Sequence, residues 1–402
     1  MKLDRGATIG VLGAGAMGSG IAQVAAASGH PSVVVVDTSE AALERARLGI
    51  DRALRREVEK GRMDGAQADD VLRRLRLVAH PQDPVDSVAI DAFAPCALVI
   101  EAIVERLDAK RAAFALLEQS VAPECVLATN TSSLSVSSIA AACARPERVL
   151  GTHFFNPAPV MPLVEIVPGV TTAPEVLAAA RALVDAWGKT TVLAADTPGF
   201  IVNRIARPFY GEALRMLEEG LADAPTIDWA MREVGGFRMG PFELMDFIGQ
   251  DVNFAVTRSV FEAFFFDARY RPSLTQQRLV EAGHLGRKSG RGFYDYRDGA
   301  SRPTPTTDRA LAERIVERVL VMLINEAADA VFLRIASPRD VDLAMTKGVH
   351  YPKGLLAWAD ELGIDRVLER LTALREEYGE DRYRASPLLK RMAREGRKFY
   401  EE

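Results

Sequence analysis

A glycine-rich turn near the N-terminus limits the folds that this chain can adopt. The segment Gly13–Gly18 (GAGAMG) follows the strand-like run Thr8–Leu12 and opens the helix-like stretch Ala16–Ser28. A second strand-like run, Val33–Val36, ends at Asp37. The pattern G-x-G-x-x-G alone occurs in many loops. With a strand before it, a helix after it and an acid about 20 residues later, it predicts a dinucleotide-binding β–α–β unit.

The three glycines of this turn each have a structural role in dinucleotide binding. Gly13 permits the tight turn, Gly15 lets the main chain approach a pyrophosphate, and Gly18 lets helix and strand pack closely. The helix N-terminus offers free N–H groups and a positive dipole to phosphates. Asp37 can accept hydrogen bonds from both ribose hydroxyls of NAD and would repel the extra phosphate of NADP. The alternative is a glycine-rich turn followed by a surface Asp.

Strand-like and helix-like segments alternate through the first half of the chain. This alternation predicts a parallel sheet with helices on both faces. After about Thr197 the strands stop, and helices are expected over Ile201–Glu219, Thr226–Val234 and Asp251–Phe266. The strand-like runs are Thr8–Leu12, Val33–Val36, Leu75–Ala79, Leu98–Ile100, Val126–Thr129, Val149–Phe155, Leu163–Val167 and Thr190–Leu193.

The C-terminal part repeats the helical part before it. A linker rich in turn formers, Ser301–Thr307, separates the two. The repeat predicts a duplicated helical domain, with residues 308–402 as a second, degenerate copy of 197–300 whose Gly-rich tail is mostly missing. A shift of 114 residues places Glu212 on Glu326, Asp228 on Asp342, Met231 on Met345, Gly240 on Gly354, Asp246 on Asp360, Gly249 on Gly363 and Asp251 on Asp365.

Composition excludes several classes of protein. The chain has 402 residues, and its 50 Lys and Arg against 55 Asp and Glu give a formal charge of −5 with no basic face, so no nucleic-acid partner is expected. No apolar stretch reaches the roughly 18 residues that cross a bilayer, so no membrane association is expected either. Three scattered cysteines suit neither a disulfide framework nor a zinc site. These features favour a cytoplasmic protein without a metal.

His153 is the best candidate for acid–base chemistry. It ends the strand-like run Val149–Thr152, and ligands of parallel sheets bind at the carboxyl ends of strands. The run Leu163–Val167 follows a Pro-rich turn and can pair antiparallel with the first, which would bring Glu165 to His153. A carboxylate that fixes the imidazole tautomer is a common general-base arrangement. A histidine beside an aromatic pair is also often structural.

Three more segments place polar groups where a site is expected. Asn130–Ser133 (NTSS) follows a strand, although Ser and Asn also cap helices. Asn203 lies at the entry to the helical domain, where a cleft between domains is expected. The acids of Glu101–Glu105 (EAIVE) follow another strand and can serve a nicotinamide or start the next helix.

Taken together, these motifs resemble the L-specific 3-hydroxyacyl-CoA dehydrogenases of β-oxidation. They occur in the family's order over residues 7–296. The resemblance implies a Rossmann-type α/β domain over 1–196, then two tandem all-α domains of the 6-phosphogluconate dehydrogenase C-terminal type over 197–300 and 308–402. The motifs are Gly13–Gly18 with Asp37, EAIVE, NTSS, His153–Pro157 (HFFNP), Thr197–Arg204 (TPGFIVNR), Gly240–Leu244 (GPFEL) and Gly286–Tyr294 (GRKSGRGFY).

The resemblance also implies site residues and a reaction. A His153–Glu165 pair would take the 3-hydroxyl proton of a (3S)-3-hydroxyacyl-CoA while hydride passes to NAD, giving the 3-oxoacyl-CoA, or would run the reverse reaction. The family's catalytic and substrate positions fall on Ser132, His153, Asn156, Glu165, Asn203 and Lys60. Its cofactor positions fall on Gly13, Gly15, Ala16, Met17, Gly18, Asp37, Glu105 and Lys110.

Two departures from the family pattern leave the substrate open. A hydroxyl that usually contacts coenzyme A is replaced by Ala53, and Arg238 stands where a proline is common. Arg238 either meets an acidic acyl end, as in 3-hydroxyadipyl-CoA, or is a solvated loop charge, and the second reading is favoured. A dehydrogenase of a free hydroxy acid such as L-gulonate and a non-catalytic NAD-binding scaffold are the rival hypotheses.

The duplication predicts an internal arrangement as well. Single-copy members of this family dimerise chiefly through their helical domains. Residues 308–402 are therefore expected to pack on 197–300 as an internal pseudo-dimer, with further homo-oligomers possible through other surfaces. The second copy is not expected to be an active site, because Glu317 occupies the position of Asn203.

Overall fold

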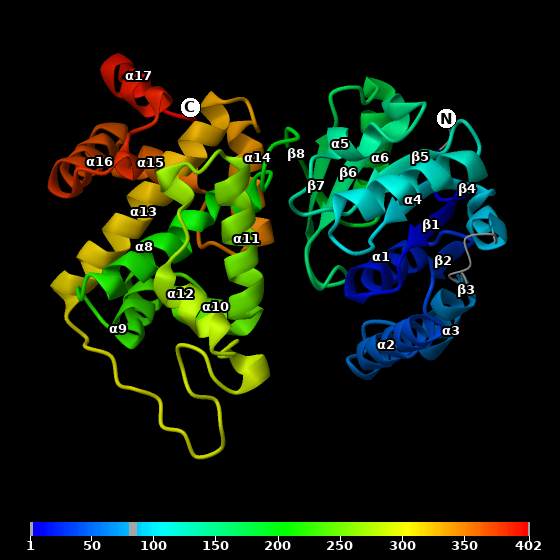
Figure 1. The fold of residues 1–402 in the computed structure, drawn as a ribbon, viewed down its shortest axis with the longest axis horizontal. Helices are drawn as coiled ribbons and strands as arrows, with labels where there is room; N and C mark the ends of the chain where they lie inside the picture. Colours follow the sequence, from blue (N-terminus) through cyan, green and yellow to red (C-terminus); the bar gives the residue numbers. More distant parts are fainter. Residues whose placement is uncertain (1–2, 80–86, 401–402) are drawn as a thin grey trace. The chain divides into compact units, whose positions relative to one another are not determined.

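The chain forms two compact units, Met1–Thr197 and Pro198–Glu402, in the computed structural model. The structure describes residues 3–79 and 87–400 (Figure 1). Among these residues, no helix is both long and apolar enough to span a lipid bilayer.

One eight-stranded sheet organises the first unit, with the strand order β3-β2-β1-β4-β5-β6-β7-β8. The pairs from β3 to β6 are parallel, as the alternation of strands and helices predicts. β7 runs antiparallel to β6, and β8 pairs parallel with β7, so the sheet is mixed at this edge. The strands are β1 Thr8–Leu12, β2 Val33–Asp37, β3 Leu75–Ala79, β4 Cys96–Glu101, β5 Val126–Thr129, β6 Val149–Phe154, β7 Leu163–Pro168 and β8 Thr190–Leu193.

Helices cover both faces of this sheet. Ile21, Ile50 and Leu183, from α1, α2 and α6, belong to the core on one face. Phe114 of α4 and Ile139 of α5 belong to the core on the other face. The prediction of a sheet enclosed by two helical layers is confirmed. The helices are α1 Ala16–Ala27, α2 Glu40–Glu59, α3 Gly65–Arg73, η1 Ser87–Phe93, α4 Leu107–Ser120, α5 Val136–Ala140, η2 Pro146–Arg148 and α6 Pro174–Ala186.

Helices are the regular elements among the described residues of the second unit, apart from isolated bridges around Arg291. The helix expected over Ile201–Glu219 is divided at Ala206, because Pro208 has no N–H to bond the carbonyl of Arg204. The first-copy elements are α7 Val202–Ile205, α8 Arg207–Glu218, α9 Ala224–Trp229, the π-helix η3 Ala230–Val234, α10 Pro241–Ile248, α11 Gln250–Ala263, η4 Ala268–Tyr270, α12 Leu274–Glu281 and η5 Arg287–Ser289.

The second copy follows the same order of elements, except that one long helix replaces α7 and α8, one helix replaces α9 and η3, and η5 has no counterpart among the described residues. That helix, α13, packs on α8 and η3 of the first copy (Figure 1). Its elements are α13 Arg309–Phe332, α14 Pro338–Gly348, α15 Leu355–Leu362, α16 Ile364–Tyr378, η6 Asp381–Tyr383 and α17 Pro387–Glu395.

Buried ion pairs between the copies are reciprocal. Arg204 of the first copy pairs with Glu326 of the second, at 2.5 Å between Nε and Oε1. Arg318 of the second copy pairs with Glu212 of the first, at 2.9 Å between Nε and Oε2. The 114-residue shift converts one pair into the other, so the two copies contact each other through equivalent residues.

The repeated Asp residues serve as helix caps and tail anchors. The carboxylate of Asp228 accepts hydrogen bonds from the first N–H groups of α10, and Asp342 does the same for α15. Asp246 accepts from the main-chain N–H groups of Phe293 and Tyr294, the end of the Gly-rich tail.

The end of the second copy keeps one contact of the Gly-rich tail. Asp360, the counterpart of Asp246, accepts from the N–H groups of Phe399 and Tyr400. Although the middle of the Gly-rich tail is missing from this copy, its final Phe-Tyr pair is retained and docks in the same way.

Candidate active site

The glycine-rich turn has the shape that a pyrophosphate needs. Gly13 has φ +105°, a conformation that favours glycine, and a Cβ on Gly18 would lie 1.8 Å from the carbonyl oxygen of Gly13. A Cβ on Gly15, in contrast, would meet nothing within 4 Å. No side chain caps the N-terminus of α1, where Ala16 and Met17 form the first turn. The space beside Gly15 and the uncapped N–H groups therefore suit a bound phosphate.

Asp37 ends β2 beside this turn. Its Oδ2 accepts a hydrogen bond from the N–H of Ala14 at 2.6 Å, and its Oδ1 accepts one from the N–H of Ser39 at 2.8 Å. These bonds orient the carboxylate and leave lone pairs on both oxygens for ribose hydroxyls. The residues present therefore fit the adenosine half of NAD.

The β6–β7 hairpin brings the proposed acid–base pair together. His153 lies directly opposite Glu165 in the antiparallel register, and its Nδ1 is 2.6 Å from Oε2 of the carboxylate. His153 is only 6% exposed and Glu165 is fully buried. The side chain of Asn130, which follows β5, accepts a hydrogen bond from the N–H of Phe154 and so ties the next strand end to this hairpin. Asn156 lies exposed three residues after His153.

Glu105 is the centre of a second polar cluster. Its Oε1 accepts hydrogen bonds from the Thr131 hydroxyl and from both the N–H and the hydroxyl of Ser132. The Nζ of Lys110 lies 3.3 Å from Oε2. Burial alone would raise the pKa of Glu105, but Lys110 and these hydrogen bonds outweigh it and lower that pKa. Glu105 therefore stays ionised and fixes the loop that carries Ser132.

Lys110 is more deeply buried than the sequence suggests. The residue is 1% exposed, and its Nζ also contacts the fully buried Glu101 at 2.6 Å. The Thr129 hydroxyl donates to the other oxygen of Glu101. The roles of Glu101 and Thr129 were missed from the sequence. The sequence could have indicated them, because β4 and β5 are successive parallel strands and their last residues, Glu101 and Thr129, lie opposite each other.

The remaining predicted residues lie elsewhere. Asn203 is half-buried on α7 of the second unit, and its carbonyl oxygen accepts a hydrogen bond from Arg207 Nε at 2.7 Å. Lys60, at the end of α2, is exposed and its Nζ bonds Glu57 at 3.0 Å. Arg238 is exposed, as expected of a solvated loop charge.

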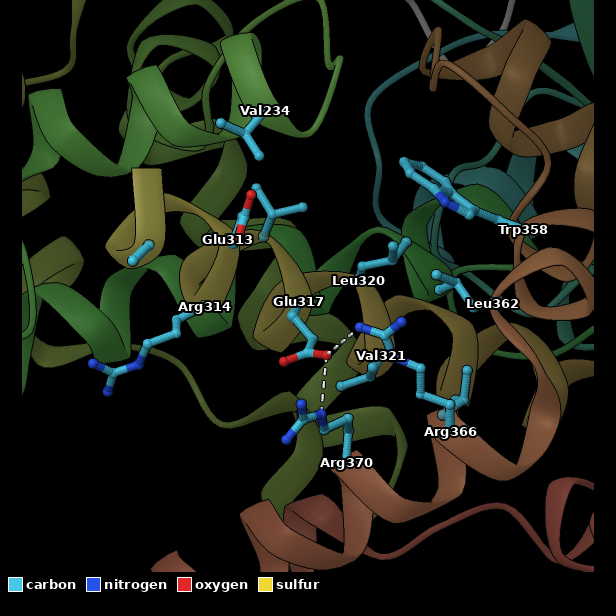
Figure 2. Close-up of a pocket in the computed structure, with 13 residues that line it drawn as sticks. Val234, Glu313, Arg314, Glu317, Leu320, Val321, Trp358, Leu362, Arg366 and Arg370 are labelled. Atoms are coloured by element: carbon cyan, nitrogen blue, oxygen red, sulfur yellow. Dashed lines mark hydrogen bonds and ion pairs between the residues drawn. The ribbon is translucent and has the colours of Figure 1, made fainter. Parts of the chain in front are cut away.

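The second copy has a cavity of about 530 Å³ beside the position equivalent to Asn203. Figure 2 shows Glu317 at this position, between Arg366 and Arg370. Its Oε1 lies 3.5 Å from Arg366 Nη2 and 3.0 Å from Arg370 Nε. Val234 and Trp358 line the same cavity. A carboxylate held by two arginines replaces the amide here.

Comparison with known proteins agrees with this geometry. The model of the 3-hydroxyacyl-CoA dehydrogenase NAD-binding domain matches residues 8–197, and the model of the 3-hydroxyacyl-CoA dehydrogenase C-terminal domain matches residues 199–296 and 315–401. The chain belongs to the 3-hydroxyacyl-CoA dehydrogenase family. Its predicted fold class, its dehydrogenase function and NAD as the cofactor are thereby confirmed.

Some relatives align with almost the whole chain and others with about seven tenths of it. The 3-hydroxyadipyl-CoA dehydrogenase of Escherichia coli is 41% identical and covers 96% of this chain and 97% of its own length. A crystal structure of 3-hydroxybutyryl-CoA dehydrogenase from Escherichia coli superposes with a TM-score of 0.89 at 40% identity, over 96% of this chain and 98% of that one. The human mitochondrial hydroxyacyl-coenzyme A dehydrogenase is 40% identical over 71% of this chain and 90% of its own length.

Proposed function

We propose that His153 and Glu165 form the general-base pair of an NAD-dependent oxidation of (3S)-3-hydroxyacyl-CoA. The contact of 2.6 Å between His153 Nδ1 and Glu165 carries this proposal. Because the carboxylate accepts the Nδ1 proton, the imidazole presents Nε2 as a proton acceptor. Nε2 takes the proton of the 3-hydroxyl while the C3–H bond breaks and the C3–O bond becomes a carbonyl. NAD, when bound, accepts the hydride. Glu165 stabilises the imidazolium that forms.

Other side chains hold the substrate oxygen and the cofactor. When substrate is bound, the Ser132 hydroxyl turns its proton from Glu105 to the substrate oxygen, while the Ser132 N–H stays on Glu105. The Asn203 amide donates to the same oxygen, and the two groups stabilise its developing charge. Glu105 orients Ser132 on the nicotinamide side, and the buried Lys110 acts through Glu105. Asn156, which lies just after β6 and three residues after His153, is the last of the proposed catalytic residues.

The proposal also includes a contact to coenzyme A and the bounds of the three domains. Lys60, exposed at the end of α2, contacts the coenzyme A part of the substrate. We assign residues 1–196 to NAD binding, 197–300 to the substrate side and 308–402 to a second copy that has no active site.

The reciprocal pairs Arg204–Glu326 and Arg318–Glu212 support an internal pseudo-dimer of the two copies. Each copy offers the other the surface that single-copy members use for dimerisation. Any further homo-oligomer would use different surfaces.

The test of this function is NADH consumption with acetoacetyl-CoA, compared with NAD reduction by free hydroxy acids such as L-gulonate. We expect turnover with the acyl-CoA alone. Turnover of the free acid alone would assign the chain to a hydroxy-acid dehydrogenase. Turnover with neither would leave a protein that only binds NAD.

A short dicarboxylic acyl-CoA is a second candidate substrate. The Escherichia coli relative named 3-hydroxyadipyl-CoA dehydrogenase aligns over almost the whole chain, second copy included. That match supports a substrate whose acyl chain ends in a carboxylate, and the equally long match to a structure named 3-hydroxybutyryl-CoA dehydrogenase supports a short acyl chain without one.

Cofactor preference gives a separate prediction. We expect kcat/KM for NAD to exceed that for NADP by at least about tenfold, because the Asp37 carboxylate repels a 2′-phosphate. The Asp37→Asn variant should narrow this difference. Glu44→Gln, an exposed isosteric change on α2, is the matched control and should preserve it. Equal kcat/KM for the two cofactors in the wild type would show that Asp37 does not face the ribose.

A further inference from the structure

Arg207 differs from the other buried arginines of the second unit. Each of the others has at least one carboxylate partner within ion-pair distance, as buried charges usually do. Arg207 is only 6% exposed and pairs with no carboxylate among the described residues. The paired arginines are Arg204, Arg215, Arg269, Arg318 and Arg382.

The hydrogen bonds of Arg207 leave one end of its guanidinium available. Nε donates to the carbonyl oxygen of Asn203 at 2.7 Å, and Nη1 donates to the hydroxyl of Thr257 at 3.0 Å. Nη2 makes no hydrogen bond with any described residue. The ring of Tyr210 lies 5.0 Å from the guanidinium carbon.

A second buried polar group, which interacts with Arg207 electrostatically, has no hydrogen-bond partner among the described residues. Tyr351, from the second copy, is 6% exposed, and its buried hydroxyl has no hydrogen-bond partner among the described residues. Burial lowers the pKa of Arg207 and raises that of Tyr351, while the two groups interact electrostatically. A buried cation without a counter-ion and a buried hydroxyl without a hydrogen-bond partner are both costly, and a carboxylate could serve as the partner of each.

This polar arrangement occurs in only one of two equivalent places. The 114-residue shift places Arg207 on Val321 and places Phe237 on Tyr351. At the pseudo-symmetric position both side chains are therefore apolar. A polar pair that served only to hold the copies together would have no reason to be confined to the side of Asn203.

We propose that Arg207, with the hydroxyl of Tyr351, binds the terminal carboxylate of a dicarboxylic acyl chain. The proposal rests on the proposed function, in which Asn203 holds the 3-oxygen. Arg207 follows Asn203 by four residues, across the division at Ala206, and its Nε lies 2.7 Å from the carbonyl oxygen of Asn203. Three bonds separate the hydroxyl carbon from the carboxylate carbon of a six-carbon diacid and span about 3.8 Å when extended. An unsubstituted acyl end would leave the guanidinium unpaired, so this site selects the diacid.

Steady-state kinetics with two substrates test this assignment. kcat and KM are measured with (3S)-3-hydroxyadipyl-CoA and (3S)-3-hydroxybutyryl-CoA for the full-length wild type, Arg207→Met, Tyr351→Phe and the control Arg238→Met. We expect the wild type to prefer the diacid. In Arg207→Met the ratio of the two kcat/KM values should fall about 10- to 100-fold, chiefly through KM for the diacid. Tyr351→Phe should lower it several-fold, and the exposed Arg238→Met should preserve it.

Several outcomes would overturn the assignment. Equal losses for both substrates in Arg207→Met would make this residue an internal brace for Asn203. A ratio that falls only in Arg238→Met would move the carboxylate site to the loop. If Arg207→Met does not fold, an unchanged ratio in Tyr351→Phe decides against the site. In each case the wild type still oxidises 3-hydroxyacyl-CoA, whereas a wild type inactive with both substrates contradicts the proposed function itself.

Discussion

The His153→Gln variant is expected to lose at least 100-fold in kcat and to retain nearly unchanged binding of NAD. The reason is that Gln keeps a polar side chain of similar reach but has no nitrogen that can take up the 3-hydroxyl proton. General-base catalysis contributes about 10²–10⁴ in rate. Because Gly13–Gly18 and Asp37 are untouched, the cofactor site should be unaffected. Stopped-flow turnover and NADH fluorescence titration measure the two quantities separately.

His284→Gln is the matched control, since this residue lies outside the hairpin and should leave kcat unchanged. A His153→Gln variant that keeps more than about a tenth of the wild-type kcat would remove His153 from the role of base. A loss of NADH binding as large as the loss of turnover would point instead to a disturbed fold around β6.

Deleting residues 301–402 is expected to give either a dimer of the shortened chain or an aggregate. The deletion removes Glu326 from Arg204, and a buried charge left unpaired costs about 3–5 kcal/mol. Glu212 loses Arg318 but keeps its pair with Arg215. It also exposes the apolar face of α8 that α13 covers. The shortened chain still carries both Arg204 and Glu212, so two copies can restore the pairs by symmetry. Light scattering and thermal unfolding measure the outcome.

A point variant separates the loss of the ion pair from the removal of a whole domain. Glu326→Gln in the full-length protein should lower the unfolding temperature, while Glu313→Gln, an exposed change on the same helix, should not. A shortened chain that remains monomeric and as heat-stable as the whole protein would contradict the proposed pseudo-dimer.

Periodicity and turn residues were sufficient to predict the sheet and the hairpin of the first unit. Thr8–Leu12 and Thr190–Leu193 are strands with the predicted bounds, because a β-branched run between turn formers defines where a strand begins and ends. The pairing of His153 with Glu165 follows from one Pro-rich turn of short length. The division of the helix at Ala206 was missed, since the effect of Pro208 depends on where the first turn of α8 begins.

Contacts between segments far apart in the chain could not be predicted from sequence patterns. The repeat aligned Glu212 with Glu326, but a shift of 114 residues says nothing about which surface the two copies share. Likewise, Arg207 reads as one more helical arginine. Only its burial and the absence of a carboxylate among its described neighbours distinguish it.

The single linker between the copies changes how the protein responds to dilution. In a dimer of separate chains, the helical contact weakens by mass action as the protein becomes scarce. Here the partner of α8 is α13 of the same chain, so its local concentration is set by the linker and stays constant. The unfolding midpoint should then be the same at nanomolar and at micromolar protein. The chain then has one NAD-binding unit for two helical copies, and the contact between the copies does not depend on protein concentration.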